Sequence, residues 1–221
     1  MSRQKKRKFA ENLERENVLQ PGKPLFEEIR GNWHRLYFKN QQPITIELGC
    51  GRGEYTIGLS QEFTERNYVG IDLKGDRIWK GSGQALELGL KNVAFLRLQI
   101  QFLERHFAED EVDEIWLTFP DPRPRDRDEK HRLSNAAFME MYRRILTKDG
   151  WFRFKTDNTD LFDYTLDLIK SAQISVRDLS YTHDLYQSDM LAEHRGITTK
   201  YEKIFSEKGE KIKYMKFRFA C

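Results

Sequence analysis

Residues 44–55 read ITIELGCGRGEY, a short apolar run that passes directly into three glycines at alternate positions. The run Ile44–Leu48 is typical of a buried strand, and the residues after Gly53 are typical of a helix. Glycines at this spacing permit left-handed backbone and let a ligand approach the main chain closely. The helix that follows presents N–H groups to an acidic group. The stretch therefore predicts a strand–turn–helix unit with a ligand-binding bend.

Strand-like and helix-like segments alternate from this unit onward. We expect strands over residues 44–48, 67–72, 93–98, 112–119, 151–156, 174–180 and 212–219. We expect helices over residues 53–63, 74–90, 100–107, 134–147 and 161–172, with short helices near 25–30 and before 207. The alternation predicts an α/β fold, with a mostly parallel sheet and helices on both faces. Because ligands of such sheets lie outside the carboxyl ends of the strands, the residues that follow each strand are the candidates for a site.

Composition and charge set the broad class of the protein. The chain has 221 residues, of which 38% are hydrophobic and 33% charged, and this fits a globular protein. We predict one domain over residues 21–221, preceded by a flexible basic arm over residues 1–20 that lacks apolar periodicity. No apolar run approaches the roughly 20 residues of a membrane span, and no signal peptide is indicated. Two distant cysteines and five scattered histidines predict no disulfide framework and no metal site, and we expect a cytoplasmic protein.

Basic residues concentrate at both ends of the chain. Residues 1–30 hold eight Lys and Arg against five Asp and Glu, and residues 195–221 hold eight against three. The formal net charge of the whole chain is only +3, so the middle is acidic. This asymmetry favours a polyanionic partner for the ends, and ordinary solvated surface charge is an equally weighted alternative.

Carboxylates stand at the ends of several expected strands. Glu47 precedes the glycines, where its charge repels a pyrophosphate and suits a cationic ligand. Asp72 can accept hydrogen bonds from both hydroxyls of a ribose, or can cap the next helix. Asp121 lies in the loop FPDPRPRDRDEKHR (119–132), whose prolines exclude a helix and whose arginines can bind phosphates or guanine edges. The alternative for this loop is a surface laced with salt bridges. Asp157 follows the fifth strand and either caps the next helix or faces the same rim as Asp121.

At four motifs the sequence resembles the bacterial tRNA (guanine-N7)-methyltransferases, which use S-adenosylmethionine. The motifs are IELGCGRGE (46–54), FPDPRPRDRDEKHRL (119–133), FKTDN (154–158) and TTKYE (198–202). The resemblance implies a Rossmann-like class I methyltransferase fold, with a mostly parallel seven-stranded sheet and an antiparallel last strand. It also implies methyl transfer from S-adenosylmethionine to N7 of a guanine in tRNA, at position 46 of the variable loop.

By position, the resemblance also implies roles for individual residues. The expected donor-binding residues are Glu47, Gly49, Gly51, Asp72, Gln99 and Asp121, and Asp121 is also the expected catalytic residue. The expected substrate-binding residues are Arg125, Asp157, Thr199, Lys200, Tyr201 and Glu202. The sequence departs from the family pattern at Gln99, Arg123 and Arg125, where the family has Asp, Trp and Lys. The expected partner is tRNA, held also by Lys5–Lys8 and the basic C-terminal part, and the protein is expected to be a monomer or a homodimer.

Other functions stay open on the residues alone. A nicotinamide-dependent oxidoreductase has a similar fold, although Glu47 and the GxGxG spacing argue against it. Gln99 leaves open a non-catalytic RNA-binding protein with a weakened donor site. A methyltransferase that acts on another RNA, a protein or a small molecule would share the fold, because a fold does not fix a substrate.

Overall fold

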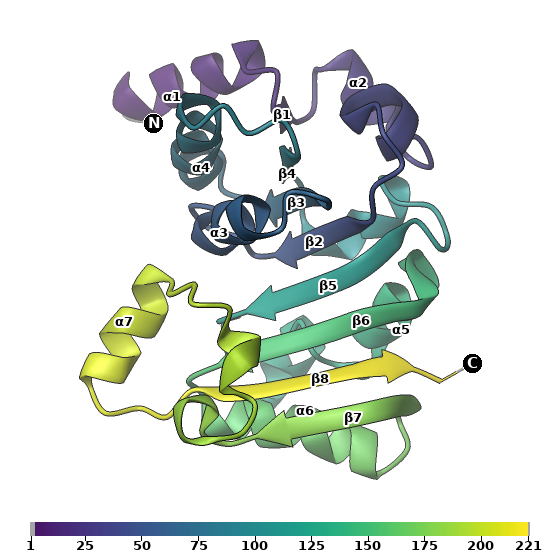
Figure 1. The fold of residues 1–221 in the computed structure, drawn as a ribbon, viewed down its shortest axis with the longest axis vertical. Helices are drawn as coiled ribbons and strands as arrows, with labels where there is room; N and C mark the ends of the chain where they lie inside the picture. The colour runs from purple at the N-terminus through teal and green to yellow at the C-terminus, as the bar shows by residue number, and fades with distance from the viewer. Residues whose placement is uncertain (1–2, 221) are drawn as a thin grey trace.

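The strand that precedes the glycines, β2 (Ile44–Leu48), lies inside an eight-stranded sheet (Figure 1). This computed structural model describes residues 3–220, and its strand order is β1-β4-β3-β2-β5-β6-β8-β7. The other strands are β1 (Val18–Leu19), β3 (Asn67–Asp72), β4 (Val93–Arg97), β5 (Val112–Thr118), β6 (Leu146–Thr156), β7 (Val176–Thr182) and β8 (Lys213–Phe219). The pairs from β1 to β6 are parallel, and β8 is antiparallel to both β6 and β7. The expected α/β class with its antiparallel last strand is confirmed.

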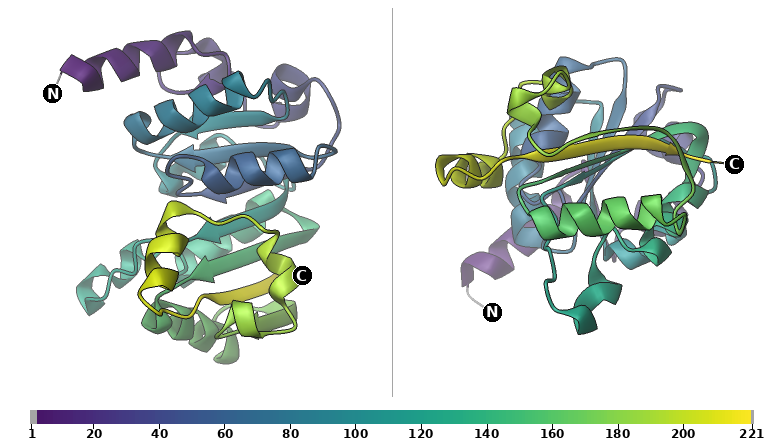
Figure 2. Two further views of the ribbon diagram at one scale, coloured as in Figure 1. Left: turned by 60° about the vertical axis from the view of Figure 1, so that its left-hand side comes forward. Right: turned by 90° about the horizontal axis from the view of Figure 1, so that it is seen from below.

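Helices cover both faces of the sheet (Figures 1 and 2). One layer consists of α2 (Pro24–Glu28), a π-helix over Trp33–Phe38, α5 (Ala136–Ile145) and α6 (Thr159–Lys170). The other layer consists of α3 (Glu54–Glu62), α4 (Gly75–Glu87) and the chain from 183 to 212, which includes α7 (Lys200–Glu207). Side chains alternate between the two layers along each strand, so Ile115 and Leu117 pack in one cluster and Trp116 in the other.

The sheet has one strand more than the sequence analysis expects. Val18 and Leu19 pair with Phe95 and Leu96 of β4 and extend the sheet at that edge. Strand β6 also begins earlier than expected, at Leu146, because the β5–β6 register shifts between Val112 and Glu114 and takes up extra residues of β6 as a bulge. The helix expected over 100–107 is a 3-10 helix over Ile100–Arg105.

The N-terminal segment differs from the flexible arm expected over residues 1–20. Within the described part it forms α1 (Arg3–Glu14) and β1, and α1 packs against α4. Asn12 donates a hydrogen bond to the carbonyl of Gly75 (2.8 Å), and Lys8 lies 4.8 Å from the ring centroid of Trp79. Apolar periodicity does not detect this helix, because amide hydrogen bonds and cation–π contacts attach it to the domain.

Three further findings bear on the sequence analysis. No helix within residues 3–220 is both long enough and apolar enough to cross a membrane. The same residues contain no cluster of three or more His, Cys, Asp or Glu side chains that could hold a metal ion. Cys50 is buried and forms no disulfide within the described residues, and Cys221 lies outside them.

Candidate active site

The registers of the parallel strands bring the expected site residues to one edge of the sheet. Leu48 of β2 is level with Leu117 of β5, and Thr118 is level with Lys155 of β6. Neighbouring strands lie about 5 Å apart, so the residues that follow them form a row along the carboxyl edge. In Figure 1 this is the edge to which the arrowheads of β2 and β5 point. The residues that leave the sheet there are Gln99, Asp72, Gly49, Asp121 and Asp157.

The glycine bend has the conformation that the sequence predicts. Gly49, Gly51 and Gly53 have φ angles of 72°, 57° and 73°, which side chains disfavour. A Cβ atom on Gly53 would lie 2.5 Å from the ring of Phe95, so this glycine is required by packing. A Cβ on Gly49 would meet no atom within 4 Å, and one on Gly51 would meet only the Gly49 carbonyl oxygen, at 4.0 Å. The space at Gly49 and Gly51 is therefore open to a ligand.

Glu47 supports this bend from inside the protein. Its side chain is buried, and its carboxylate accepts hydrogen bonds from the main chain of Thr56 (2.8 Å) and from the hydroxyls of Thr56 and Thr118 (2.7 Å for Thr118). Burial raises the pKa of Glu47 to about 7, although these hydrogen bonds favour the charged form. Glu47 thus ties β2 to α3 and β5, and sequence analysis missed its two threonine partners.

Asp72 combines the two roles that the sequence leaves open. One carboxylate oxygen accepts a hydrogen bond from the main chain of Gly51 (3.0 Å), and the other accepts one from Lys74 just before α4 (2.7 Å). Each carboxylate oxygen has a second lone pair for a ligand hydroxyl. Asp72 therefore fixes the glycine bend and can still accept hydrogen bonds from a ribose. Gln99, on the neighbouring strand end, is exposed, and its side-chain oxygen accepts a hydrogen bond from Gln101 (3.2 Å).

The loop that carries Asp121 leaves the same edge. Phe119 and Arg123 have φ angles of 47° and 48°, a left-handed conformation that is costly for residues other than glycine and is often found at functional sites. Asp121 is exposed, and its carboxylate lies 3.2 Å from the guanidinium nitrogen Nε of Arg123. Arg125 forms an ion pair with Asp128 (2.6 Å). The loop therefore contains the salt bridges of the surface-loop alternative and also holds an acid at the expected edge.

Asp157 follows β6, and the TTKYE motif begins α7. Asp157 is partly buried, and burial raises the pKa of its carboxyl group. The helix cap is Asn158, whose side chain accepts a hydrogen bond from the main chain of Leu161 (2.8 Å), so of the two alternatives for Asp157 that of the helix cap is wrong. Thr199 and Glu202 are buried and form a capping box at the start of α7.

The remaining residues of the motif differ from these two. Lys200 and Tyr201 are exposed, so they are accessible to a substrate. Glu202 is fully buried and lies 2.7 Å from the ammonium group of Lys155, so its carboxylate is held by a partner within the protein. Sequence analysis gave no role to Lys155, which lies between Phe154 and Thr156 at the end of β6.

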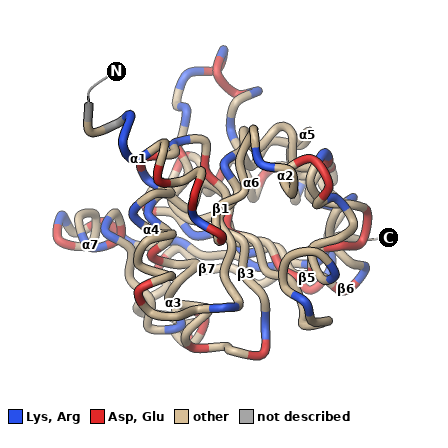
Figure 3. Tube along the Cα trace, turned by 90° about the horizontal axis from the view of Figure 1, so that it is seen from above, with Lys and Arg blue, Asp and Glu red and all other residues tan. Residues whose placement is uncertain are grey.

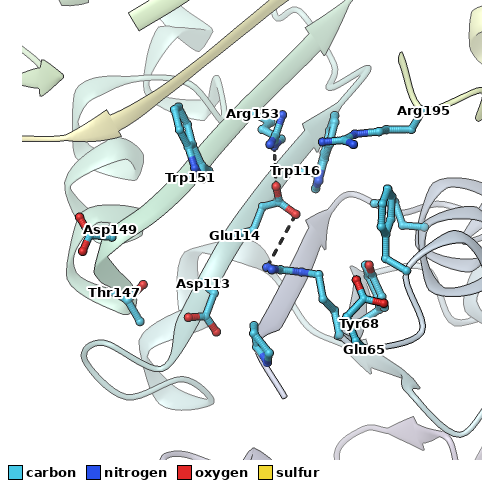
Figure 4. A pocket seen from close by; sticks show the side chains of 14 residues that line it. Glu65, Tyr68, Asp113, Glu114, Trp116, Thr147, Asp149, Trp151, Arg153 and Arg195 are labelled. Atoms are coloured by element: carbon cyan, nitrogen blue, oxygen red, sulfur yellow. Dashed lines mark hydrogen bonds and ion pairs between the residues drawn. The ribbon is translucent and has the colours of Figure 1, made fainter. Parts of the chain in front are cut away.

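A cavity of about 490 Å³ lies elsewhere, toward the amino ends of β2, β5 and β6 (Figure 4). Trp116 and Trp151 line it, and Glu114 bridges Arg66 (4.0 Å) and Arg153 (2.5 Å) there. None of the expected site residues lines this cavity. Most of its charges already have partners within the protein, so the carboxyl edge is the better candidate for the site.

Comparisons with known proteins identify the family to which the chain is similar. A family model described as "Putative methyltransferase" matches residues 41–215. The chain is 49% identical over 219 residues to the tRNA (guanine-N(7)-)-methyltransferase of Cytophaga hutchinsonii, covering 99% of each chain. It is 43% identical to the protein of the same name from Christiangramia forsetii, covering 98% of each chain.

The fold is shared with solved structures as well. The crystal structure of the 16S rRNA methyltransferase KamB is similar with a TM-score of 0.62 and 14% identity, covering 93% of this chain and 99% of that chain. The resemblance drawn from the sequence motifs is confirmed, and the oxidoreductase alternative is set aside. This chain belongs to the S-adenosylmethionine-dependent tRNA (guanine-N(7)-)-methyltransferase family.

Proposed function

We propose that this chain transfers a methyl group from S-adenosylmethionine to N7 of the guanine at position 46 in the variable loop of tRNA. The observation that carries the proposal is the open glycine bend on the same sheet edge as Asp121. The relatives named above, whose names give tRNA and guanine N7, support it over nearly the full length of the chain. We place the reaction in the cytoplasm and the protein in a monomeric or homodimeric state.

The residues at the carboxyl edge fit the methyl donor. The open space at Gly49 and Gly51 admits a ligand against the main chain, and the second lone pairs of Asp72 accept hydrogen bonds from ribose hydroxyls. The exposed amide of Gln99 can both donate and accept hydrogen bonds toward the adenine, in the place of the family's aspartate. When bound, S-adenosylmethionine supplies an electrophilic methyl group on a sulfonium.

The chain's own residues then have to position the guanine. N7 carries an in-plane lone pair, so no strong base is needed to create the nucleophile. Correct placement supplies about 7–11 kcal/mol of the barrier. The guanine ring becomes positively charged as the methyl group arrives, and the carboxylate of Asp121 beside the ring favours that transition state. The guanidinium of Arg123, which contacts Asp121 here, can stack on a base as a planar cation.

Basic residues near this edge suit the tRNA backbone (Figure 3). Lys6 and Arg7 on α1, Arg127 and Lys130 in the Asp121 loop, and Lys200 on α7 are exposed. The basic residues of β8 are less available to phosphates than the sequence suggests, because they contact acidic or carbonyl groups within the protein. Lys213 donates a hydrogen bond to the carbonyl of Asp157, Lys216 pairs with Glu193, and Arg218 lies near Asp149 and Asp178. We therefore assign phosphate contacts to α1, the Asp121 loop and α7.

Incubation with labelled S-adenosylmethionine and unmodified tRNA transcripts tests the function. We expect 7-methylguanosine at position 46, mapped by mass spectrometry of nuclease fragments. A transcript with adenine at that position is the matched control and should stay unlabelled. Label on ribosomal RNA fragments but not on tRNA would overturn the proposal.

Replacement of Asp121 by alanine tests the catalytic assignment. Because Asp121 is exposed, Asp121→Ala should leave the melting temperature nearly unchanged. We expect kcat to fall about 100-fold or more, the scale on which loss of one charge-stabilising group acts. Asp126→Ala, in the same loop and also exposed, is the control and should keep near-normal turnover. A near-normal rate for Asp121→Ala would exclude a catalytic role for this carboxylate.

A further inference from the structure

Lys155 is a charged residue enclosed at the end of β6. Its side chain and that of Glu202 in α7 are both fully buried, with 2.7 Å between Nζ and Oε1. The ammonium also lies 5.4 Å from the ring centroid of Tyr55, in the first turn of α3. Burial lowers the pKa of Lys155, and the charge of Glu202 opposes that shift. A buried ion pair adds little net stability compared with apolar residues of the same size, so its place beside the active edge points to another role.

Glu202 joins the turns of the segment 183–207, which we call the strap. The oxygen that faces Lys155 also accepts a hydrogen bond from the hydroxyl of Tyr186 (3.0 Å) and lies 3.3 Å from Nε2 of His194. Its other oxygen faces the main-chain N–H of Thr199 (3.4 Å). Burial alone would raise the pKa of Glu202, but His194 and Lys155 outweigh it and the pKa is lowered. One charged carboxylate thus contacts both 3-10 turns of the strap (Leu185–Gln187 and Leu191–His194) and the start of α7.

The strap also contacts the helix that follows the glycine bend. The main-chain N–H of Lys200 donates a hydrogen bond to Glu54 (3.1 Å), and Ile197 packs so closely over Gly58 that a Cβ there would lie 2.8 Å from it. The main chain of Lys155 contacts the loop that carries Asp121. Its carbonyl accepts a hydrogen bond from the main-chain N–H of Phe119, at the start of that loop (2.8 Å). Lys155 therefore connects the strap, through its side chain, with the loop, through its main chain.

We propose that Lys155 is a positioning residue for methyl transfer, which fixes the strap through Glu202 without touching the donor or the guanine. The exposed residues Lys200 and Tyr201 are thereby held at a set place relative to the Asp121 loop, where the target nucleotide enters. Glu202, expected from the motif to bind substrate, acts through this contact. This inference rests on the proposed function only where its test measures methylation of tRNA.

The test uses Lys155→Met, Glu202→Gln and the double variant in the full-length protein. Methionine keeps the length of the lysine without its charge, and glutamine can still complete the capping box of α7. For each single variant we expect a loss of about ten-fold or more in kcat/KM for tRNA, mainly through KM, with the Kd for S-adenosylmethionine within about two-fold of wild type. The double variant should lose no more kcat/KM than the more impaired of the two single variants, since both substitutions remove the same contact.

Amide hydrogen exchange supplies a measurement that does not depend on tRNA. In the free protein, exchange over residues 185–205 should speed up in both single variants. Arg144→Met is the control, because it removes exposed ion pairs with Glu104 (2.6 Å) and Glu140 (3.2 Å) that lie outside the strap. It should leave both the exchange and the kinetics unchanged.

Three outcomes would overturn the inference. They are additive losses in the double variant, exchange of the strap at the wild-type rate in either single variant, or a weakened donor Kd as the main defect. If Lys155→Met does not fold, Glu202→Gln decides, and wild-type exchange and kcat/KM in that variant reject the inference. Failure of the wild-type protein to methylate tRNA would instead reject the proposed function, and the exchange and donor-binding measurements would still decide the role of Lys155.

Discussion

The protonation and the role of Glu47 depend on the side chains that surround it in the folded protein. Its position before the glycines suggests a carboxylate that faces a cationic ligand. The folded chain instead encloses it between the hydroxyls of Thr56 and Thr118, where burial disfavours the negative charge. Its contribution to the proposed donor site is then indirect, through the shape of the bend that it holds. Because the pKa of this carboxyl group is raised by folding, the free energy of unfolding depends on pH.

Glu47→Gln should remove that dependence. The pKa of Glu47 is about 7 in the folded protein and 4.5 in the reference state, so the native state binds the extra proton between these values. The free energy of unfolding of the wild type therefore falls as the pH rises through this window, by about 2–3 kcal/mol. Urea unfolding at about pH 5 and about pH 8 should show Glu47→Gln gaining that much relative to wild type at the higher pH. If the free energies of unfolding of the two proteins changed in parallel with pH, a raised pKa of Glu47 in the folded protein would be contradicted.

At the scale of elements, α1 and the strap are the parts that local sequence describes least well. The strands and α3 to α6 follow apolar periodicity and capping signals, and most lie close to their expected bounds. Helix α1 is basic in its first half, and it is held by polar contacts such as that of Asn12 with the main chain of Gly75 in α4. Asn17, which follows the helix, donates a second hydrogen bond to the main chain of α4, at Ser82. A periodicity of apolar residues carries no information about such contacts. Its exposed basic side chains are consequently available to a polyanion.

Replacement of Lys6 and Arg7 by alanine tests this helix as a tRNA-binding element. Removal of one phosphate-binding charge should flatten the dependence of log K on log salt by about 0.7–0.9, so the double variant should change the slope by about 1–2. The free energy of unfolding should hardly change, because the ion pair of Arg7 with Glu11 (3.3 Å) is exposed. Filter binding over a range of salt concentrations measures the slope.

The matched control for this helix removes two exposed lysines at the opposite edge of the sheet. Lys91 precedes β4, and Lys148 lies at the start of β6. Lys91→Ala with Lys148→Ala should keep the wild-type slope. The same slope for the α1 variant as for wild type would refute a role for α1 in binding tRNA.

The proposed donor site depends on the packing of the whole molecule. Gly53 and Gly81 are packed tightly beneath the bend, against Phe95 and the main chain of Arg52, whereas the space at Gly49 stays open. That difference arises because β4 and α4 close one side of the bend and the carboxyl edge of the sheet leaves the other side clear. A ligand that occupies the clear side stabilises the native state as a whole.

S-adenosylmethionine should therefore raise the melting temperature, and NADH should not. At a donor concentration of about 100 times Kd the gain is about 2.7 kcal/mol, or about 5–10 °C for a chain of this size. Gly49→Ala and Gly89→Ala form a matched pair, since φ is 72° and 69° and neither Cβ would meet an atom within 4 Å. Both should cost about 1–2 kcal/mol of strain. Only Gly49→Ala should lose the shift with the donor, and equal shifts in both variants would place the donor elsewhere.

The sequence alone determined the alternation of strands and helices, the bend after β2, and the edge at which Asp72, Asp121 and Asp157 emerge. These features depend on local periodicity and on the φ angles that glycine permits, and both can be read from neighbouring residues. The tertiary structure decided that Glu47 is buried, that α1 is folded onto α4, and that Lys155 meets Glu202. Each of these depends on a contact between residues far apart in the chain, and the free energy of a buried charge or amide is fixed only when the folded path brings its partner to it.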